Sequence, residues 1–286
     1  MNKTLKKIKS PLAIERAYIK RLKQLSTDIN KSVLWWANAR LHKNISKNIG
    51  NQLAFEFNAL LDEWDKKTNE VAKTLAKKIS KQVKNYVDLN LNSQNPEFKL
   101  KSVTKQSKNA LSAIYQNNLA LIKTIPSDII ERYRSAYLNN VNNFDREQIY
   151  RLAKTYQGIS NRRAKTIARD QTQKAVSNFT QARAEQLGFE YYEWVTAGDE
   201  RVSKDHQHLN GRVYRYDTPT AKIDSYGNVG HPSQRVNCLA KGQGVDFGYF
   251  PRRLFRFSSF DKFAVLTLRD GNIWVVTRNH KVLTHN

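Results

Sequence analysis

Several residue types are scarce in this chain of 286 residues, and each scarcity excludes a class of protein. There is one cysteine, Cys238, so no disulfide can form within the chain, and such usage is typical of a reducing compartment. No apolar run approaches the ~20 residues that a membrane-spanning helix needs. The basic N-terminus has no apolar segment of the kind that a secretory signal contains. We therefore expect synthesis in the cytoplasm and no membrane partner.

Acidic residues are also few. The chain has 25 Asp and Glu against 49 Lys and Arg, which gives a formal net charge of +24. The first 50 residues are strongly one-sided, with 12 basic residues opposed only by Glu15 and Asp28. So large an excess repels itself in a compact protein and indicates an anionic partner. Nucleic acid is the first partner to expect, and an acidic protein surface is the second.

No glycine-rich loop interrupts the N-terminal half, and apolar residues recur there every three or four positions, which predicts amphipathic helices. Ser10 and Pro11 form a helix start, the Asn-rich residues 89–96 form a linker, and Pro126 and Gly158 are expected to end helices. The predicted helices are one that starts at Pro11, then 53–91, 104–125, 127–137, 145–156 and 160–187.

After Leu187-Gly188, a helix stop, the pattern changes to strands and loops. Residues 189–195 alternate apolar and polar types, and Asp270-Gly271 is a strong turn signal inside a β-hairpin. These patterns predict an α+β fold in three parts. They are a mainly helical region over residues 1–156, a small mixed α+β module over 157–246, and a basic aromatic tail with the hairpin over 247–286.

Four segments carry a family resemblance. They are RRAKTIARDQTQKAVSNFTQARAEQLG, YYEWVTAGDERV, LNGRVY and GHPSQRVNCLA, in this order. In their order and spacing they closely resemble the phage Mu F-like minor head proteins, also called phage head-morphogenesis proteins. The resemblance covers about residues 155–245.

The resemblance implies a minor structural protein of a phage or prophage head. Such a protein would act in head morphogenesis at or near the portal vertex, in the virion head and in the host cytoplasm during assembly. Its expected partners are the portal protein, other head or capsid proteins, and double-stranded DNA without sequence specificity. The family implies no established enzymatic activity, so we expect neither an enzyme nor a cofactor.

The resemblance also suggests a metal site. Many relatives carry a Cys-x-x-Cys pair and a downstream His-Pro…Cys-x-Cys cluster, which looks like zinc ligation. In this chain Ser203 and His206 replace the first pair and Ala240 replaces the last cysteine, so His206, His231 and Cys238 remain as candidates. Structural zinc requires four ligands. We therefore expect no zinc, and loops held together by hydrogen bonds.

A metal-dependent nuclease or DNA-binding enzyme is the alternative function. It would use Asp205, His206 and His208, together with His231 and Cys238. A histidine–metal nuclease needs a general base and a metal ligand on a ββα frame. The segment after His208 reads as a turn and a strand, so this frame is not visible in the sequence.

The polar residues between the strands have a structural interpretation as well. Asp and Asn side chains close turns by bonding to nearby backbone amides, and a buried Arg satisfies several acceptors. The residues to which we assign this role are Asp199, Arg201, His206, Asn210, Gly211 and Asn237.

Two basic groups are candidates for contact with nucleic acid or the portal. They are Lys3, Lys6, Lys7 and Lys9 at the N-terminus, and Arg162, Arg163, Lys165 and Arg169 on one helix. No motif for base recognition accompanies them, so any DNA contact should be independent of sequence. The first helix is itself basic and amphipathic, a pattern that suits a DNA surface or a membrane surface.

Overall fold

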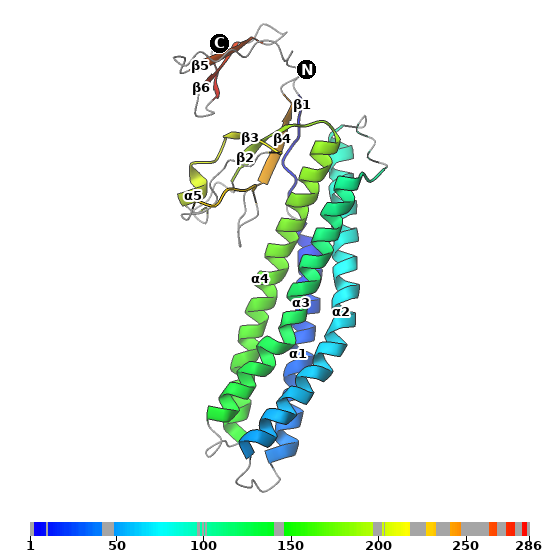
Figure 1. The fold of residues 1–286 in the computed structure, drawn as a ribbon, viewed down its shortest axis with the longest axis vertical. Helices are drawn as coiled ribbons and strands as arrows, with labels where there is room; N and C mark the ends of the chain where they lie inside the picture. The colour runs from blue at the N-terminus through cyan, green and yellow to red at the C-terminus, as the bar shows by residue number, and fades with distance from the viewer. Residues whose placement is uncertain are drawn as a thin grey trace. The chain divides into compact units, whose positions relative to one another are not determined.

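The structure is a computed structural model, and it divides the chain into two compact units (Figure 1). The bundle unit comprises Ser10–Tyr86 and Lys108–Val176, and the sheet unit comprises Met1–Lys9, Val87–Ser107 and Ser177–Asn286. The predicted boundaries at residues 156 and 246 stay predictions. The residues that the structure describes are 3–9, 11–41, 49–95, 98, 100, 102–139, 146–196, 202, 204–217, 227–232, 241–246, 263–267, 273–277 and 282–284.

Four long helices supply most of the described residues, and with the strands they confirm the broad α+β class. They are α1 (Leu12–Leu41), α2 (Ile49–Gln94), α3 (Lys105–Asn139) and α4 (Arg146–Gln186). Within the bundle unit the four run side by side (Figure 1). Each is amphipathic, so its apolar stripe is buried against its neighbours.

Polar side chains inside the bundle fix how α1 and α3 pair. The Tyr18 hydroxyl donates to Asn118 Oδ1 at 2.7 Å, and the Tyr133 hydroxyl donates to Asn30 Oδ1 at 2.9 Å. Asn30 and Asn118 also donate their amide nitrogens to carbonyls one turn earlier in their own helices. These buried polar groups are therefore partnered, as a low-dielectric interior requires.

The predicted helix breaks at Pro126 and Gly158 were wrong. Pro126 lies inside α3, Gly158 lies inside α4, and the start of the predicted linker at 89–94 is the end of α2. Burial explains the difference at Pro126, since Ile125, Ile129 and Ile130 are all nearly inaccessible around it. Tertiary packing of an apolar face supplies more helix stability than a local breaker removes.

The end of α4 agrees with its prediction. Gly188 has a φ of 87°, the left-handed region that glycine adopts without strain. The amides of Gly188 and Phe189 donate to the carbonyls of Glu185 and Ala184, which closes the helix and turns the chain into the first strand of the sheet.

The sheet unit contains a four-stranded antiparallel sheet in the order β1-β4-β2-β3. Its strands are β1 (Lys3–Thr4), β2 (Tyr191–Val195), β3 (Val213–Arg215) and β4 (Lys241–Asp246). The N-terminal strand therefore pairs with residues more than two hundred positions later, with Lys3 opposite Asp246 and Thr4 opposite Val245.

The N-terminal segment continues into the core of this unit. Leu5 and Ile8 are buried, and the Gln94 side chain bridges the backbone of Lys6 by accepting from its amide at 2.7 Å and donating to its carbonyl at 3.0 Å. A side-chain amide thus replaces the strand partner that a longer sheet would provide.

The predicted C-terminal hairpin is confirmed in its strands. β5 (Phe263–Thr267) pairs antiparallel with β6 (Ile273–Thr277), with Thr267 opposite Ile273. A third strand, β7 (Val282–Thr284), extends this sheet beside β6. Asp270 and Gly271 lie outside the described residues.

Candidate functional site on the aromatic face of the sheet

One face of the four-stranded sheet is aromatic. Strand β2 alternates as the sequence predicts, with Tyr192 and Trp194 fully buried and their neighbours partly exposed. Tyr214 of β3 lies opposite Tyr192 in the register, and their ring centroids are 5.9 Å apart. The ring of Tyr216 lies 4.9 Å from that of Tyr192. These four side chains form the floor on which the candidate histidines lie.

His206 packs on this floor. It belongs to the short helix α5 (Lys204–Gln207), is 4% exposed, and its ring meets Trp194 edge to face at 5.4 Å. His208, two residues later, is exposed, and its Nδ1 lies 3.4 Å from the Lys204 carbonyl. Two of the three histidines of the nuclease hypothesis, His206 and His208, therefore occupy different environments, one inside the unit and one at its surface.

His231 lies on the same floor. Its Nδ1 and the Tyr192 hydroxyl share a hydrogen bond of 3.1 Å, and the two rings meet at 5.5 Å. Burial lowers the pKa of His231, and a hydrogen bond with the backbone of Tyr216 acts weakly in the opposite direction. Burial also raises the pKa of the Tyr192 and Tyr216 phenols. Burial therefore favours the neutral forms of His231 and of the two phenols.

The structure describes only two of the three candidate zinc ligands, His206 and His231. Among the residues that the structure describes, no three His, Cys, Asp or Glu side chains are grouped closely enough to hold a metal ion. Cys238, the third candidate, lies outside the described residues, as do Ser203 and Ala240. The expectation of no zinc therefore stays a prediction.

The turn between β2 and β3 is closed by Asn210 and Gly211. Asn210 Oδ1 accepts from the backbone amide of Thr196 at 2.8 Å and from its hydroxyl at 2.9 Å. Gly211 has a φ of 76°, and its amide donates to the Trp194 carbonyl at 2.8 Å. This is the kind of bonding that we expected from the polar loop residues. Three other residues of that set lie outside the described residues, namely Asp199, Arg201 and Asn237. Asp205, a residue of the nuclease hypothesis, is described in its backbone only.

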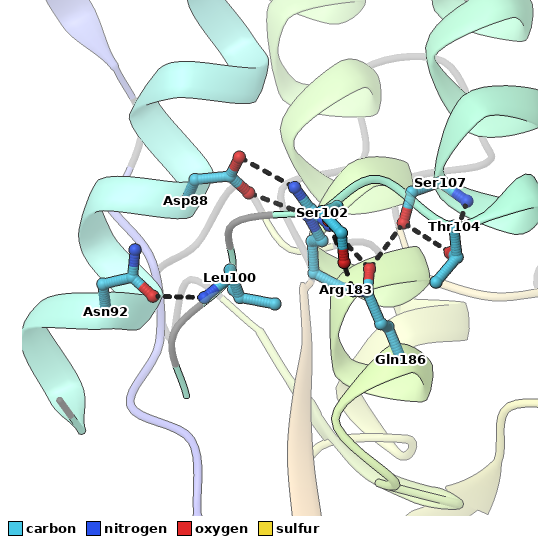
Figure 2. A network of polar contacts seen from close by, with 8 residues as sticks. All are labelled: Asp88, Asn92, Leu100, Ser102, Thr104, Ser107, Arg183 and Gln186. Carbon is cyan, nitrogen blue, oxygen red and sulfur yellow. Dashed lines mark hydrogen bonds and ion pairs between the residues drawn. The ribbon is translucent and has the colours of Figure 1, made fainter. Parts of the chain in front are cut away.

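Sequence reasoning missed Arg183, which forms several hydrogen bonds within the described part of the sheet unit. Arg183 is 0% exposed and forms a two-pronged ion pair with Asp88, through Nε at 2.8 Å and Nη2 at 2.9 Å (Figure 2). Its Nη1 donates to the Ser102 carbonyl at 2.7 Å and to Gln186 Oε1 at 2.6 Å. The guanidinium also lies 5.1 Å from the Phe179 ring centroid. The sequence offered one weak signal, because Arg183 stands between two small apolar residues, Ala182 and Ala184.

The network around Arg183 ties three chain segments together. Gln186 Oε1 accepts from the Ser107 hydroxyl at 3.1 Å, and Thr104 Oγ1 accepts from the Ser107 amide at 3.3 Å, which caps the start of α3 (Figure 2). Asn92 Oδ1 accepts from the Leu100 amide at 3.2 Å. The end of α2, the connection to α3 and the end of α4 are thereby joined within the sheet unit.

The structure distinguishes among the basic residues proposed as contacts. Lys7 donates its ammonium to the Thr196 carbonyl at 3.0 Å, and Arg163 pairs with Asp128 at 2.7 Å, so both have structural partners. Arg162 and Lys165 are exposed, Arg169 is half-buried, and Lys6 and Lys9 are exposed. For Lys3 only the backbone pairing of β1 is described.

By its fold and its candidate site the chain is an α+β protein that contains a long helical bundle and a small sheet with one aromatic face. The family follows from comparison. Residues 128–241 match the family described as Phage Mu protein F like protein, which confirms the resemblance, so this part of the chain is Mu F-like.

Two further comparisons bear on the chain. An uncharacterized protein of Haemophilus influenzae is 33% identical over 133 residues, which is 45% of this chain and 28% of that relative. The chain thus spans well under half of the length of the relative that it matches. No solved structure matches the chain. In the described part of the chain, none of the helices has the length and apolar character that crossing a membrane requires.

Proposed function

We propose that this chain is a minor structural protein of a phage or prophage head that acts in head morphogenesis at the portal vertex. The observation that carries the proposal is the Mu F-like match over residues 128–241. This stretch includes the end of α3, the whole of α4 with Arg183, and strands β2 and β3 with the aromatic side chains on which His206 and His231 pack.

The geometry supports a scaffold more than a catalyst. The two candidate histidines that are buried, His206 and His231, pack edge to face against Trp194 and Tyr192. Buried aromatic and hydrogen-bonded groups of this kind rigidify a small domain. A chain that combines such a rigid module with a long helical bundle suits a protein that binds neighbouring proteins during assembly.

The proposed partners are the portal protein and other head proteins, with packaged DNA as a second partner. The net charge of +24 supports an anionic partner of either kind. The exposed cations Arg162 and Lys165 lie on α4 inside the Mu F-like stretch, and they are the first residues that we assign to such an interaction.

A head-incorporation experiment tests the proposal. The gene would be deleted in the phage or prophage that carries it and complemented with a tagged copy, after which heads, tails and free portal would be purified separately. We expect the tagged chain in portal-containing heads, and non-infectious particles without it. Finding the chain only in tails or in the soluble fraction, with infectious particles made in its absence, would overturn the proposal.

A further inference from the structure

A basic hollow lies along the outer face of α1. It has a volume of about 400 Å³, and its lining residues are Arg16, Ile19, Lys20, Lys23, Gln24 and Thr27. The three cations are exposed. Their positions, i, i+4 and i+7, place them on one stripe of the helix because 3.6 residues make one turn.

The three cations are available to a ligand. In the described part of the chain, Arg16, Lys20 and Lys23 have no acidic side chain within ion-pair distance. Asp28, an acid close to the end of the stripe, receives a hydrogen bond from Gln24 at 2.8 Å. Like charges at this spacing repel one another, and that cost is removed when an anion binds between them.

The chemistry of the lining points to phosphate groups. A guanidinium and two ammonium groups are side-chain types that contact the phosphates of nucleic acids. The Gln24 amide and the Thr27 hydroxyl already donate to Asp28 and to the Lys23 carbonyl, so the three cations carry the proposed contact. From Arg16 to Lys23 the stripe extends about 10 Å along the helix axis. Double-stranded DNA carries one phosphate per about 1.7 Å of duplex length, so a stripe of this length lies within reach of more than one phosphate.

Two other occupants fit less well. An amphipathic helix binds a membrane by burying its apolar face in lipid, but the apolar face of α1, with Tyr18, Leu22 and Ile29, is already buried in the bundle. A protein partner is usually anchored by aromatic residues in a desolvated pocket, but Ile19 is the one apolar residue in the lining.

We propose that the hollow formed by Arg16, Lys20 and Lys23 on α1 binds the phosphate backbone of double-stranded DNA without sequence preference. The site lies outside residues 128–241 and uses no residue of the Mu F-like match. It assigns a binding site to the DNA partner named in the proposed function and rests on that function only for this partner. Head incorporation and DNA binding can therefore succeed or fail separately.

The test is a binding titration of the full chain with a fluorescent 30-base-pair duplex over a range of salt concentrations. The variant is R16Q/K20Q/K23Q, which removes three charges from the hollow. We expect an at least tenfold weaker affinity at low salt. The slope of log K against log salt should become less steep by about 0.9 for each phosphate that the variant no longer neutralises.

A matched control removes the same charge from another exposed helix face. Lys77, Lys78 and Lys81 of α2 are exposed and do not line the hollow, so K77Q/K78Q/K81Q changes the net charge equally. We expect this control to bind within about threefold of the unaltered chain. Thermal unfolding of both variants checks that the fold is retained, which exposed substitutions should allow.

Any one of the following results would overturn the inference. The first is an equal loss of affinity in both triple variants, because net charge alone would then explain binding. The second is an unchanged affinity and salt slope in R16Q/K20Q/K23Q. The third is a variant that keeps DNA binding but loses binding to vesicles of phosphatidylserine and phosphatidylcholine, which would assign the hollow to a membrane surface. A clearly different affinity for a duplex of another sequence would also contradict binding through the phosphate backbone.

Discussion

At the scale of single residues, burial separates Arg183 from the surface cations. The Arg183–Asp88 pair has side chains that are 0% and 11% exposed, whereas Arg151 and Glu147 of α4 form a pair at 69% and 76% exposure. Exposed pairs contribute little because water screens both charges. A buried pair depends on its partner, because a charge left alone in the interior loses its hydration without compensation.

Replacing Asp88 with Ala should therefore be strongly destabilising. The Arg183 guanidinium would keep its bonds to Ser102 and Gln186 but lose its counterion. We expect the free energy of unfolding to fall by about 3–5 kcal/mol, measured by urea denaturation. Glu147→Ala, the control at an exposed pair, should cost about 0.5 kcal/mol or less. Equal effects of the two substitutions would show that the buried network does not support the fold.

His231 should make the free energy of unfolding fall as the pH is lowered. Its pKa is lowered by burial in the folded chain, so the unfolded chain takes up the proton first as the pH falls. The contribution of neutral His231 is then complete above its unfolded pKa of about 6.5 and is lost as the pH falls from there through the folded pKa. Chemical denaturation between pH 8 and pH 5 measures this loss.

The variant His231→Gln tests the assignment, since glutamine can still bond to the Tyr192 hydroxyl but does not titrate. We expect it to lose less stability between pH 7 and pH 5 than the unaltered chain. His208→Gln, at an exposed position, should retain the full acid sensitivity. If both variants keep the same dependence on pH, His231 is not the group responsible.

At the scale of elements, the helices run through residues that usually end them. Gly158 lies in the middle of α4, and a Cβ added there would meet only Arg162 Nη1 at 3.9 Å. Gly188, by contrast, sits just after the end of α4 with a φ of 87°. The same residue type therefore has opposite roles at the two positions, one tolerated inside the helix and one required to end it.

Substitution by alanine should separate these roles. Gly158→Ala is expected to raise the free energy of unfolding by about 0.5–1 kcal/mol, because alanine loses less backbone entropy in a helix. Gly188→Ala should lower it by about 1–2 kcal/mol, because a Cβ is strained in the left-handed region. Thermal denaturation of the two variants provides the comparison. Destabilisation by Gly158→Ala would mean that α4 needs a kink there.

At the scale of the whole molecule, the net charge is +24, and the basic residues behind it fall into two groups. Some cations are held by structural partners, and others are exposed to solvent. Arg163 belongs to the first group through Asp128 and the Thr124 hydroxyl, while its neighbours Arg162 and Lys165 are exposed. We expect those exposed cations that lie at a contact face, such as Arg162 and Lys165, to account for the counterions that are released when the chain meets a polyanion.

We expect the affinity for duplex DNA to be independent of sequence and to fall steeply as the salt concentration rises. If six to ten phosphates are contacted, the binding constant should fall by about three to five decades between 50 and 200 mM salt. R162Q/K165Q should reduce the slope by about 0.9 for each phosphate that is no longer neutralised. Arg163→Gln should change binding less, because its guanidinium is already paired with Asp128 at 2.7 Å.

Gel-shift titrations and head incorporation, run on the same variants, distinguish DNA from a protein partner. If R162Q/K165Q lowers incorporation into heads and leaves DNA binding unchanged, this face docks on an acidic protein surface. If neither measurement responds, the charge of these residues serves only to keep the surface solvated.

What the sequence by itself determined is local. Periods of three or four residues predicted the long helices, alternation predicted β2, Gly188 marked the end of α4, and the Asp270-Gly271 signal predicted the hairpin strands β5 and β6. Each of these signals depends on neighbouring residues that constrain the same few backbone dihedrals. The order of four motifs predicted the Mu F-like family, which comparison confirmed.

Only the tertiary structure decided which distant residues meet. It paired Arg183 with Asp88, 95 positions away, placed the N-terminal strand beside β4, and turned His206 and His231 onto aromatic rings. It also carried α3 through Pro126 and α4 through Gly158. The free energy of such contacts comes from burial and from long-range partners, and neither quantity is contained in the spacing of residues along the chain.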